Sequence, residues 1–398
     1  MKIGIYGGTF NPPHLGHMTA AKTAAQVLGL DKLIIIPTAV PPHKQLPEGS
    51  ATPDQRLEMV RLMADNLNMP GVVQVSDIEL RRQGKSYTVD TLVAMAALHP
   101  EAELWLLMGT DMFLSVHNWY QPKKIMELAG LCAFGRTEQD GEELFAPQRA
   151  FLQDKYNARL TTITLPGLVD ISSTQLRGAL TQGRGEEYLC PAVYGYILMN
   201  GLYGVKTDLK HLDLPELRAC SYSMVRAKRI PHIMGTEEEA VRLAKRWGVD
   251  ETTARRAAIL HDCTKYLELD EQLALCRKYG VELDELEQRA VKLLHSKTGA
   301  CIAKHIFGED EQVCRAIFWH TTGKTDMTMP EKVIYLADYI EPTRDFDGVE
   351  PLRALAYEDI DRALLMGMDM TIEEMKQRGN PVHRNTQAAR DWLWERRN

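Results

Sequence analysis

Residues 2–17 of the chain read Lys2-Ile3-Gly4-Ile5-Tyr6-Gly7-Gly8-Thr9-Phe10-Asn11-Pro12-Pro13-His14-Leu15-Gly16-His17. Residues 2–6 have the apolar character of a buried strand, and residues 15–28 have helical spacing with Gly29 as a C-cap. Glycines at a strand end let backbone N–H groups approach a phosphate, and His14 and His17 share one face of the first helical turn. The helix N-terminus adds partial positive charge. The segment therefore predicts a strand–turn–helix unit that binds a polyphosphate.

The alternation of strand and helix continues to about residue 200. Apolar runs predict further strands at 32–37, 72–76, 78–80, 103–108, 131–135 and 160–165, and periodic stretches predict helices at 56–66 and 88–98. Strands that alternate with helices indicate βαβ units, and ligands of such sheets bind beyond the carboxyl ends of the strands. The predicted fold of this half is an α/β doubly wound parallel sheet of the Rossmann-like type.

The strand signal disappears after about residue 210. Apolar spacing of 3.6 residues predicts nine helices, at 215–224, 237–247, 252–261, 270–279, 283–295, 297–307, 312–320, 331–340 and 357–377. We therefore predict an all-α second domain over residues 215–398, a first domain over residues 1–203, and a linker over residues 204–214.

Composition excludes several classes of protein. The 398 residues carry 47 Lys plus Arg against 54 Asp plus Glu, a net charge of −7 that divides almost evenly between the two halves. This balance argues against a nucleic-acid binder, and no apolar run reaches the ~18–20 residues of a membrane span. No signal peptide is expected. The seven cysteines form no Cys-x-x-Cys pair and are typical of reduced thiols in a cytoplasmic protein. Whether the chain forms a homo-oligomer stays open.

A second phosphate-binding segment reads Ile171-Ser172-Ser173-Thr174-Gln175-Leu176-Arg177. Ser172 is a candidate N-cap, which would leave the hydroxyls of Ser173 and Thr174 and several N–H groups facing outward, with Arg177 one turn further on. Alone, the segment is also compatible with an ordinary capped helix. Together with residues 7–17, it favours a phosphate site.

The two segments together resemble the nucleotidylyltransferase superfamily. Between them stand Pro41-Pro42-His43-Lys44, Ser86-Tyr87-Thr88-Val89-Asp90-Thr91-Leu92, Gly109-Thr110-Asp111 and Trp119-Tyr120. This set resembles the bacterial nicotinate-nucleotide adenylyltransferases over residues 1–203. The resemblance implies adenylyl transfer from ATP to nicotinate mononucleotide, assisted by Mg²⁺, which yields nicotinate adenine dinucleotide and pyrophosphate in NAD biosynthesis. Relatives that make phosphopantetheine or glycerol products lack the segment at 86–92 and are the alternative.

The resemblance also implies roles for single residues. Such transfer needs positioning and charge neutralisation, so His14 and His17 would hold the ATP phosphates while Lys44 and Arg177 stabilise the leaving pyrophosphate. The implied ATP-binding residues are Gly8, Thr9, Phe10, His14, His17, Gly109, Asp111, Ile171, Ser172, Ser173, Thr174 and Arg177, with Asp170 as another candidate beside the adenine. Those implied for nicotinate mononucleotide are Lys44, Thr88, Trp119 and Arg136.

Potential metal ligands are spread over the predicted helices of the second half. They adjoin apolar segments and come in the order His232, His261, Asp262, His295, His320 and Asp338. One such histidine is more often a core residue than a ligand. An ordered set of six that includes the adjacent pair His261-Asp262 indicates a metal centre, and mixed imidazole and carboxylate ligands suit Fe or Mn.

This order resembles the HD-domain metallophosphohydrolases. The strings His261-Asp262-Cys263-Thr264-Lys265, Leu293-Leu294-His295, His320-Thr321-Thr322-Gly323 and Ala337-Asp338-Tyr339-Ile340-Glu341-Pro342-Thr343-Arg344 resemble the bacterial HD-domain symmetrical diadenosine tetraphosphate hydrolases. This match runs over about residues 215–378. Ile233 stands where that family usually has a serine.

The resemblance implies a dinuclear Fe or Mn site and a hydrolase. His232, His261, Asp262 and Asp338 would bind the first ion, and Asp262 would bridge to a second ion held by His295 and His320. Lys265 and Arg344 would neutralise substrate phosphates, Asp262 and Lys265 would be catalytic, and the products would be two ADP. The alternatives are a different adenylyl- or cytidylyltransferase in the first half and a nucleotide-sensing regulatory module in the second.

Overall fold

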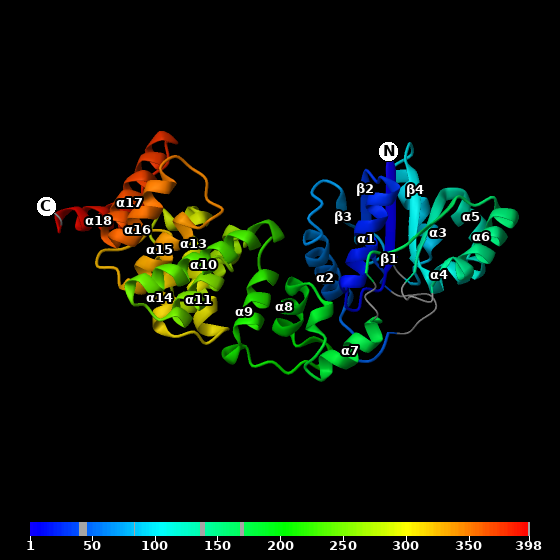
Figure 1. The fold of residues 1–398 in the computed structure, drawn as a ribbon, viewed down its shortest axis with the longest axis horizontal. Helices are drawn as coiled ribbons and strands as arrows, with labels where there is room; N and C mark the ends of the chain where they lie inside the picture. Colours follow the sequence, from blue (N-terminus) through cyan, green and yellow to red (C-terminus); the bar gives the residue numbers. More distant parts are fainter. Residues whose placement is uncertain (40–45, 83, 136–139, 168–170, 397–398) are drawn as a thin grey trace. The chain divides into compact units, whose positions relative to one another are not determined.

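The computed structural model describes residues 1–39, 46–82, 84–135, 140–167 and 171–396 (Figure 1). The chain divides into two compact units, Met1–Lys206 and Thr207–Asn398. None of the helices in these described ranges is long and apolar enough to cross a membrane. All seven cysteines are buried free thiols, as the sequence predicts.

The first unit is built on a sheet of six parallel strands in the order β3-β2-β1-β4-β5-β6. The order reverses between β1 and β4, where Ile5 of β1 lies between Ile34 of β2 and Leu106 of β4. Ligands of such sheets bind outside the carboxyl ends of the strands at this reversal. The strands are β1 (Lys2–Gly8), β2 (Lys32–Pro37), β3 (Val73–Val75), β4 (Glu103–Gly109), β5 (Ala129–Phe134) and β6 (Leu160–Ile163).

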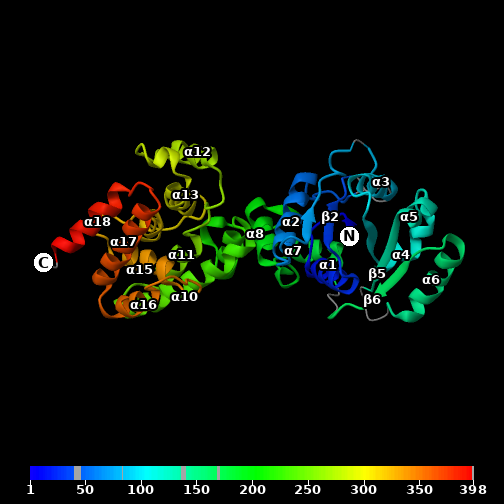
Figure 2. The same ribbon diagram turned by 90° about the horizontal axis from the view of Figure 1, so that it is seen from above.

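Helices cover both faces of this sheet, which confirms the doubly wound fold (Figure 2). Side chains of β1, β4 and β5 form a buried core with α3, α5 and α6, and α1 lies on the opposite face. Local signals explain the helix ends: α1 ends at Gly29, whose φ is 59°, and α2 begins at Thr52, whose hydroxyl accepts the Gln55 N–H at 3.2 Å. The helices are α1 (Leu15–Leu28), α2 (Pro53–Asp65), α3 (Thr88–Leu98), α4 (Thr110–Ser115), α5 (Pro122–Leu128), α6 (Glu142–Tyr156), α7 (Ser173–Thr181) and α8 (Pro191–Asn200).

The strand predicted at residues 78–80 is wrong. These residues form a turn, in which the Arg81 N–H donates to the Asp77 carbonyl at 3.1 Å and the Arg82 N–H to the Glu79 carbonyl at 3.2 Å. Its apolar residues are partly buried, and Ile78 packs against the core beside the sheet. In a short stretch of sequence, apolar residues indicate burial, but they do not distinguish a strand from a turn.

The described residues of the second unit form helices and no strands, so the all-α prediction is confirmed. Short 3₁₀ turns at Ala227–Arg229 and Glu287–Arg289 precede α10 and α13. The helices are α9 (Leu214–Ser223), α10 (Ile230–Trp247), α11 (Glu251–Leu260), α12 (Leu269–Tyr279), α13 (Val291–His305), α14 (Glu311–Trp319), α15 (Met329–Ile340), α16 (Val349–Glu358), α17 (Ile360–Gln377) and α18 (Arg384–Glu395).

Several predicted helix boundaries in this unit are wrong. The helices predicted at 283–295 and 297–307 are one helix, α13. It begins later because Asp284 and Glu287, which accept each other's backbone N–H at 2.9 Å, start only a short 3₁₀ turn, and Ala290 (φ −114°, ψ 83°) then leaves the helical conformation. The helix predicted at 357–377 is α17 together with the last residues of α16, most of which was not predicted, since Asp359 leaves the helical conformation and caps α17. Helix α10 begins at Ile230, before the predicted residue 237, and α18 was not predicted.

A buried ion network attaches the start of α18 to the turn before α13. The His383 Nδ1 accepts the Asn385 N–H at 3.1 Å, so a neutral His383 carries its proton on Nε2, which lies 3.3 Å from Asp284 Oδ2 and 3.2 Å from Glu287 Oε1. The Lys297 ammonium lies 2.6 Å from Glu287. Although burial opposes the shift, hydrogen bonds from His383 and Lys297 lower the pKa of Glu287 to about 2. The carboxylates of Asp284 and Glu287 thus already face the His383 proton and the Lys297 ammonium. We therefore assign the group a structural role, as an ion network.

Candidate functional sites

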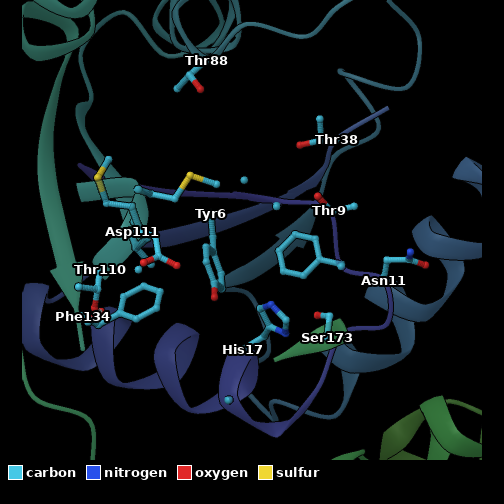
Figure 3. A pocket seen from close by; sticks show the side chains of 18 of the residues that line it. Tyr6, Thr9, Asn11, His17, Thr38, Thr88, Thr110, Asp111, Phe134 and Ser173 are labelled. Carbon is cyan, nitrogen blue, oxygen red and sulfur yellow. Dashed lines mark hydrogen bonds between the residues drawn. The ribbon is translucent and has the colours of Figure 1, made fainter. Parts of the chain in front are cut away.

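A cavity of about 1000 Å³ opens at the carboxyl ends of β1 and β4 (Figure 3). It brings together segments that are far apart in the sequence, and all twelve residues predicted for ATP line it, as do Thr88 and Trp119. Lys44, Arg136 and Asp170 lie outside the described residues. The lining residues singled out from the sequence are Gly8, Thr9, Phe10, His14, His17, Thr88, Gly109, Asp111, Trp119, Ile171, Ser172, Ser173, Thr174 and Arg177.

The turn after β1 is compact because of Gly8 and Phe10. Phe10 is 2% exposed and has a φ of 48°, in the left-handed region. A Cβ at Gly8 would lie 3.0 Å from the Phe10 ring, so a side chain at position 8 would push this ring away. Phe10 in turn packs against His17, with ring centroids 5.1 Å apart. The turn therefore positions the histidine.

His14 and His17 lie together at the start of α1, as their spacing predicts. His14 is the N-cap, and its ring centroid is 3.8 Å from that of His17. The His14 backbone N–H donates to Nδ1 of His17 at 3.1 Å. An Nδ1 that accepts a hydrogen bond has no proton, so neutral His17 carries its proton on Nε2. Nε2–H is thus the donor that His17 offers to an anion in the cavity.

The second phosphate segment forms the start of α7, against the first. Ser172 is the N-cap and accepts the Gln175 N–H at 3.2 Å, as predicted. Arg177 donates from Nη1 to the Asn11 carbonyl at 2.7 Å, which fixes its guanidinium beside the first turn. Figure 3 shows Ser173 and His17 on one side of the cavity and Thr88 on the other. The two sides can hold different parts of a substrate pair.

Arg56 supports this site through backbone carbonyls, and the sequence analysis missed it. It is fully buried in α2, and its guanidinium donates to the carbonyls of Thr9 at 2.8 Å, Thr38 at 2.6 Å and Ala39 at 3.2 Å. Burial lowers its pKa. Arg56 joins the turn after β1 to the chain that leaves β2. A charged residue within an otherwise apolar helix face is the signal that could have found it.

We expect Arg56→Met to loosen this part of the first unit. The change leaves three part-buried carbonyls without their charged donor, and we expect it to lower the free energy of local unfolding by about 1–3 kcal/mol. Native-state hydrogen exchange of the β1 and β2 amides measures this directly. Arg61→Met on the same helix is the control because Arg61 is exposed and pairs with Glu58, its neighbour on the helix surface. Equal protection in both variants would contradict the assigned role.

The opposite side of the cavity offers aromatic rings and hydroxyls. Thr88 opens α3, and the rings of Tyr87 and Tyr120 lie 4.8 Å apart beside Trp119. Glu79, also missed from the sequence, lines the cavity and accepts the Thr91 hydroxyl at 2.7 Å. Burial raises its pKa. This side suits a flat ring with polar substituents.

In the second unit, the six predicted metal ligands come together from five segments. The Nε2 atoms of His232 and His261 lie 3.2 Å apart, and Asp338 Oδ1 lies 3.0 Å from the first of them. Asp262 lies between two groups, with Oδ2 3.5 Å from His261 Nε2 and Oδ1 3.1 Å from His295 Nε2. Two ligand sets therefore share Asp262. The first set is His232, His261, Asp262 and Asp338, and the second is Asp262, His295 and His320.

The protonation of the four histidines points to cations between them. Each Nδ1 faces an acceptor, namely Glu341 Oε1 for His232 and a carbonyl of the preceding turn for His261, His295 and His320, at 2.6–3.0 Å. Each Nδ1 must then carry the proton, which leaves lone pairs on Nε2.

These lone pairs face one another in close pairs. The Nε2 atoms of His295 and His320 are 3.1 Å apart, and those of His232 and His261 are 3.2 Å apart. Burial lowers the pKa of His232, and burial with the neighbouring histidines holds the pKa of His320 well below its ordinary value. Neutral imidazoles whose lone pairs converge repel unless a cation lies between them. The residues present therefore fit a pair of metal ions.

The two carboxylates are ionised and already paired with cations. Burial opposes ionisation, but Lys265 beside Asp262 and Arg344 beside Asp338 help to hold the pKa of each carboxyl well below its usual range. Lys265 lies 3.0 Å from Asp262 Oδ1, and Arg344 lies 2.8 Å from Asp338 Oδ1. Arg229, which the sequence analysis missed, contacts Asp262 Oδ2. Its place three residues before His232, on the same helical face, was the available signal.

Glu341 orients the His232 ring through a hydrogen bond with Nδ1. Its carboxylate accepts the His232 Nδ1–H at 3.0 Å and the Thr343 N–H at 2.6 Å. A Cβ at Gly235 would clash with Glu341 Oε2, so glycine is what lets this carboxylate reach the histidine. Ile233 is fully buried in the core. His232 thus takes its supporting contact from Glu341 and needs no hydroxyl at position 233.

Comparisons with known proteins agree with this division. A family model described as cytidylyltransferase-like matches residues 5–179, and one described as HD domain matches residues 229–343. A probable nicotinate-nucleotide adenylyltransferase of Carboxydothermus hydrogenoformans is 35% identical over 203 residues, which cover 51% of this chain and 98% of that protein. One from Desulfitobacterium hafniense is 37% identical over 210 residues, which cover 51% of this chain and 96% of that protein.

One solved structure is also similar in sequence. The crystal structure of a predicted HD superfamily hydrolase involved in NAD metabolism from Clostridium acetobutylicum is 40% identical, with a TM-score of 0.46. The match covers 46% of this chain and 98% of that one.

Proposed function

We propose that this chain, which belongs to the nicotinate-nucleotide adenylyltransferase family over its first half and carries an HD domain in its second, is a bifunctional nucleotide enzyme. The first unit would transfer the adenylyl group of ATP to nicotinate mononucleotide. The second would hydrolyse diadenosine tetraphosphate to two ADP. The relatives' names support the first activity, and the shared-carboxylate ligand sets support the second.

The observation that carries the first activity is the two-sided cavity. On one side the Nε2–H of His17, the Arg177 guanidinium and the N-terminus of α7 suit the ATP phosphates. On the other side Thr88 and Trp119 suit the nicotinate ring. Attack by the mononucleotide phosphate on the α-phosphorus of ATP breaks the α–β bond and releases pyrophosphate. Mg²⁺ would neutralise the leaving group when bound.

We expect the first unit to prefer the acid mononucleotide to the amide. The nicotinate carboxylate gains charge-assisted hydrogen bonds from the start of α3, and a site built to bond one group rejects the analogue that lacks it. The kcat/KM values for nicotinate and nicotinamide mononucleotides measure this preference. A panel that adds phosphopantetheine separates the proposal from the alternative transferases. Equal kcat/KM for acid and amide would show that Thr88 and Trp119 do not bind the carboxylate.

The observation that carries the second activity is Asp262, which one ligand set shares with the other. A bound pair of divalent cations, Fe or Mn by ligand type, supplies Lewis-acid activation of a phosphoryl group and of water. Lys265 and Arg344 lie beside the same carboxylates and can pair with substrate phosphates. A polyphosphate with about four negative charges matches this concentration of cations.

A nucleotide-sensing module is the alternative for the second unit. It would also bind metals and a polyphosphate, but it would not turn the nucleotide over. Incubation of the full chain with diadenosine tetraphosphate and Mn²⁺, with ADP quantified by chromatography, decides between the two. ADP as the sole product supports symmetrical hydrolysis, and unchanged substrate supports the sensing module.

A further inference from the structure

Arg229 lies against the metal-ligand cluster but belongs to neither ligand set. Its Nε and Nη2 contact Asp262 Oδ2, and Nη2 lies 3.9 Å from Asp338 Oδ1. Its side chain is 17% exposed. The guanidinium charge therefore lies beside both carboxylates of the first ligand set. The guanidinium is also largely shielded from water.

A metal ion bound by the first set would meet this charge directly. The same two oxygens, Asp262 Oδ2 and Asp338 Oδ1, lie 3.8 Å and 3.0 Å from His232 Nε2. A cation placed among these atoms would be a few ångströms from the guanidinium. Repulsion between like charges is strong in a site that excludes water. The guanidinium and a metal ion thus compete for the same carboxylate oxygens.

The other two cations of the cluster are held differently. Arg344 also donates from Nε to the Asp338 backbone carbonyl at 2.9 Å, which anchors it beside that residue. Lys265 lies on Asp262 Oδ1 and is 33% exposed, so it can turn into solvent. Within the described part of the chain, the Arg229 guanidinium hydrogen-bonds to Asp262 alone. Its release from Asp262 therefore breaks no other hydrogen bond.

We propose that Arg229 is a displaceable counter-ion of the first ligand set and a phosphate ligand of the loaded site. This inference rests on the proposed hydrolase function of the second unit. Without metal, the guanidinium neutralises Asp262 and Asp338. When a divalent cation takes these oxygens, the planar fork of Arg229 becomes available to a substrate phosphate at the same place. Metal loading and polyphosphate binding would then strengthen each other.

A different role for Arg229 predicts the opposite sign. If Arg229 served only to orient Asp262 for the metal, its removal would weaken metal binding, typically by ~10- to 100-fold. If it competes with the metal, its removal strengthens metal binding. The direction of the change in metal affinity therefore separates the two roles without any measurement of activity.

Titration of the metal-free full chain with Mn²⁺ is the first test. We expect Arg229→Met to bind the first Mn²⁺ at least ~5-fold more tightly than the wild type, the lower end of usual coupling between sites. Arg226→Met is the matched control because Arg226 is exposed in the same segment, and it should leave the affinity unchanged. Unchanged or weaker Mn²⁺ binding in Arg229→Met would overturn the inference. A wild type that binds no Mn²⁺ would instead refute the proposed hydrolase.

Binding of a methylene-bridged diadenosine tetraphosphate analogue to the Mn²⁺-loaded chain is the second test. Loss of one Arg–phosphate contact should weaken binding by ~10- to 100-fold in Arg229→Met and not in Arg226→Met. Binding in the first-unit cavity contributes equally to both proteins and cancels in the comparison. Arg229→Lys keeps the charge without the planar fork, so it should bind Mn²⁺ as the wild type does and the analogue more weakly. This variant carries the test if the Met variant does not fold, and wild-type affinity for the analogue would overturn the phosphate role.

Discussion

Replacement of His17 by alanine should lower the rate of adenylyl transfer by ~10²–10³, while hydrolysis by the second unit continues. The Nδ1 of His17 accepts the His14 N–H at 3.1 Å, so neutral His17 carries its proton on Nε2, the nitrogen that we expect to donate to the phosphates. Charge on the α-phosphate grows only in the transition state, so the loss should fall on kcat more than on KM. Steady-state kinetics with ATP and nicotinate mononucleotide measure both constants.

Two further variants keep this prediction specific. His17→Asn retains an acceptor near the position of Nδ1 and can keep the His14 hydrogen bond, but it has no donor at Nε2. It should therefore be nearly as slow as His17→Ala and fold better. His99→Ala, at the end of α3, changes a histidine that does not line the cavity and should transfer normally. A His17→Asn enzyme with the wild-type kcat would show that His17 only shapes the turn.

Much of the fold could be predicted because its signals are local. Runs such as Leu33–Ile36 alternate with amphipathic helices, and this pattern specifies a parallel sheet without knowledge of any distant contact. Caps at Ser172 and Gly29 are equally local, since each depends on residues within one turn. The prediction failed where the signal is ambiguous, as at residues 78–80, where partly buried apolar residues form a turn.

The candidate sites divide in the same way. His14 and His17 are three residues apart, so their common face could be predicted, and the adjacent pair His261-Asp262 could be recognised within an ordered set of ligands. The supporting residues Arg56 and Arg229 carry weak local signals, but their contacts could not be predicted, because each contact is with a distant segment. Arg56 contacts the carbonyl of Thr9, 47 positions earlier, and Arg229 reaches Asp262, 33 positions later. No periodicity or spacing rule encodes such pairs, and only the folded chain brings them together.

Replacement of Asp262 by alanine should abolish the hydrolase and remove both metal ions, while adenylyl transfer in the first unit is unaffected. Asp262 contributes Oδ2 to one ligand set and Oδ1 to the other. Its loss should therefore cost more than the loss of His320, which belongs to one set. Mass spectrometry of the folded proteins counts metal ions per chain. We expect two in the wild type, none in Asp262→Ala and one in His320→Ala.

A purely structural role for Asp262 makes a different prediction. Asp262 is fully buried and pairs with Lys265 at 3.0 Å and with Arg229, so alanine would leave two cations without their carboxylate. That loss alone would cost about 0.5–3 kcal/mol of stability but would leave the metals bound. Asp262→Asn keeps the shape and the hydrogen-bond acceptor while it removes the charge, so it should stay folded and still lose the metals. Asp270→Ala, at an exposed position in the first turn of α12, is the control and should retain both metals. An Asp262→Asn chain that keeps two metals and still splits diadenosine tetraphosphate would show that this carboxylate does not bridge a metal pair.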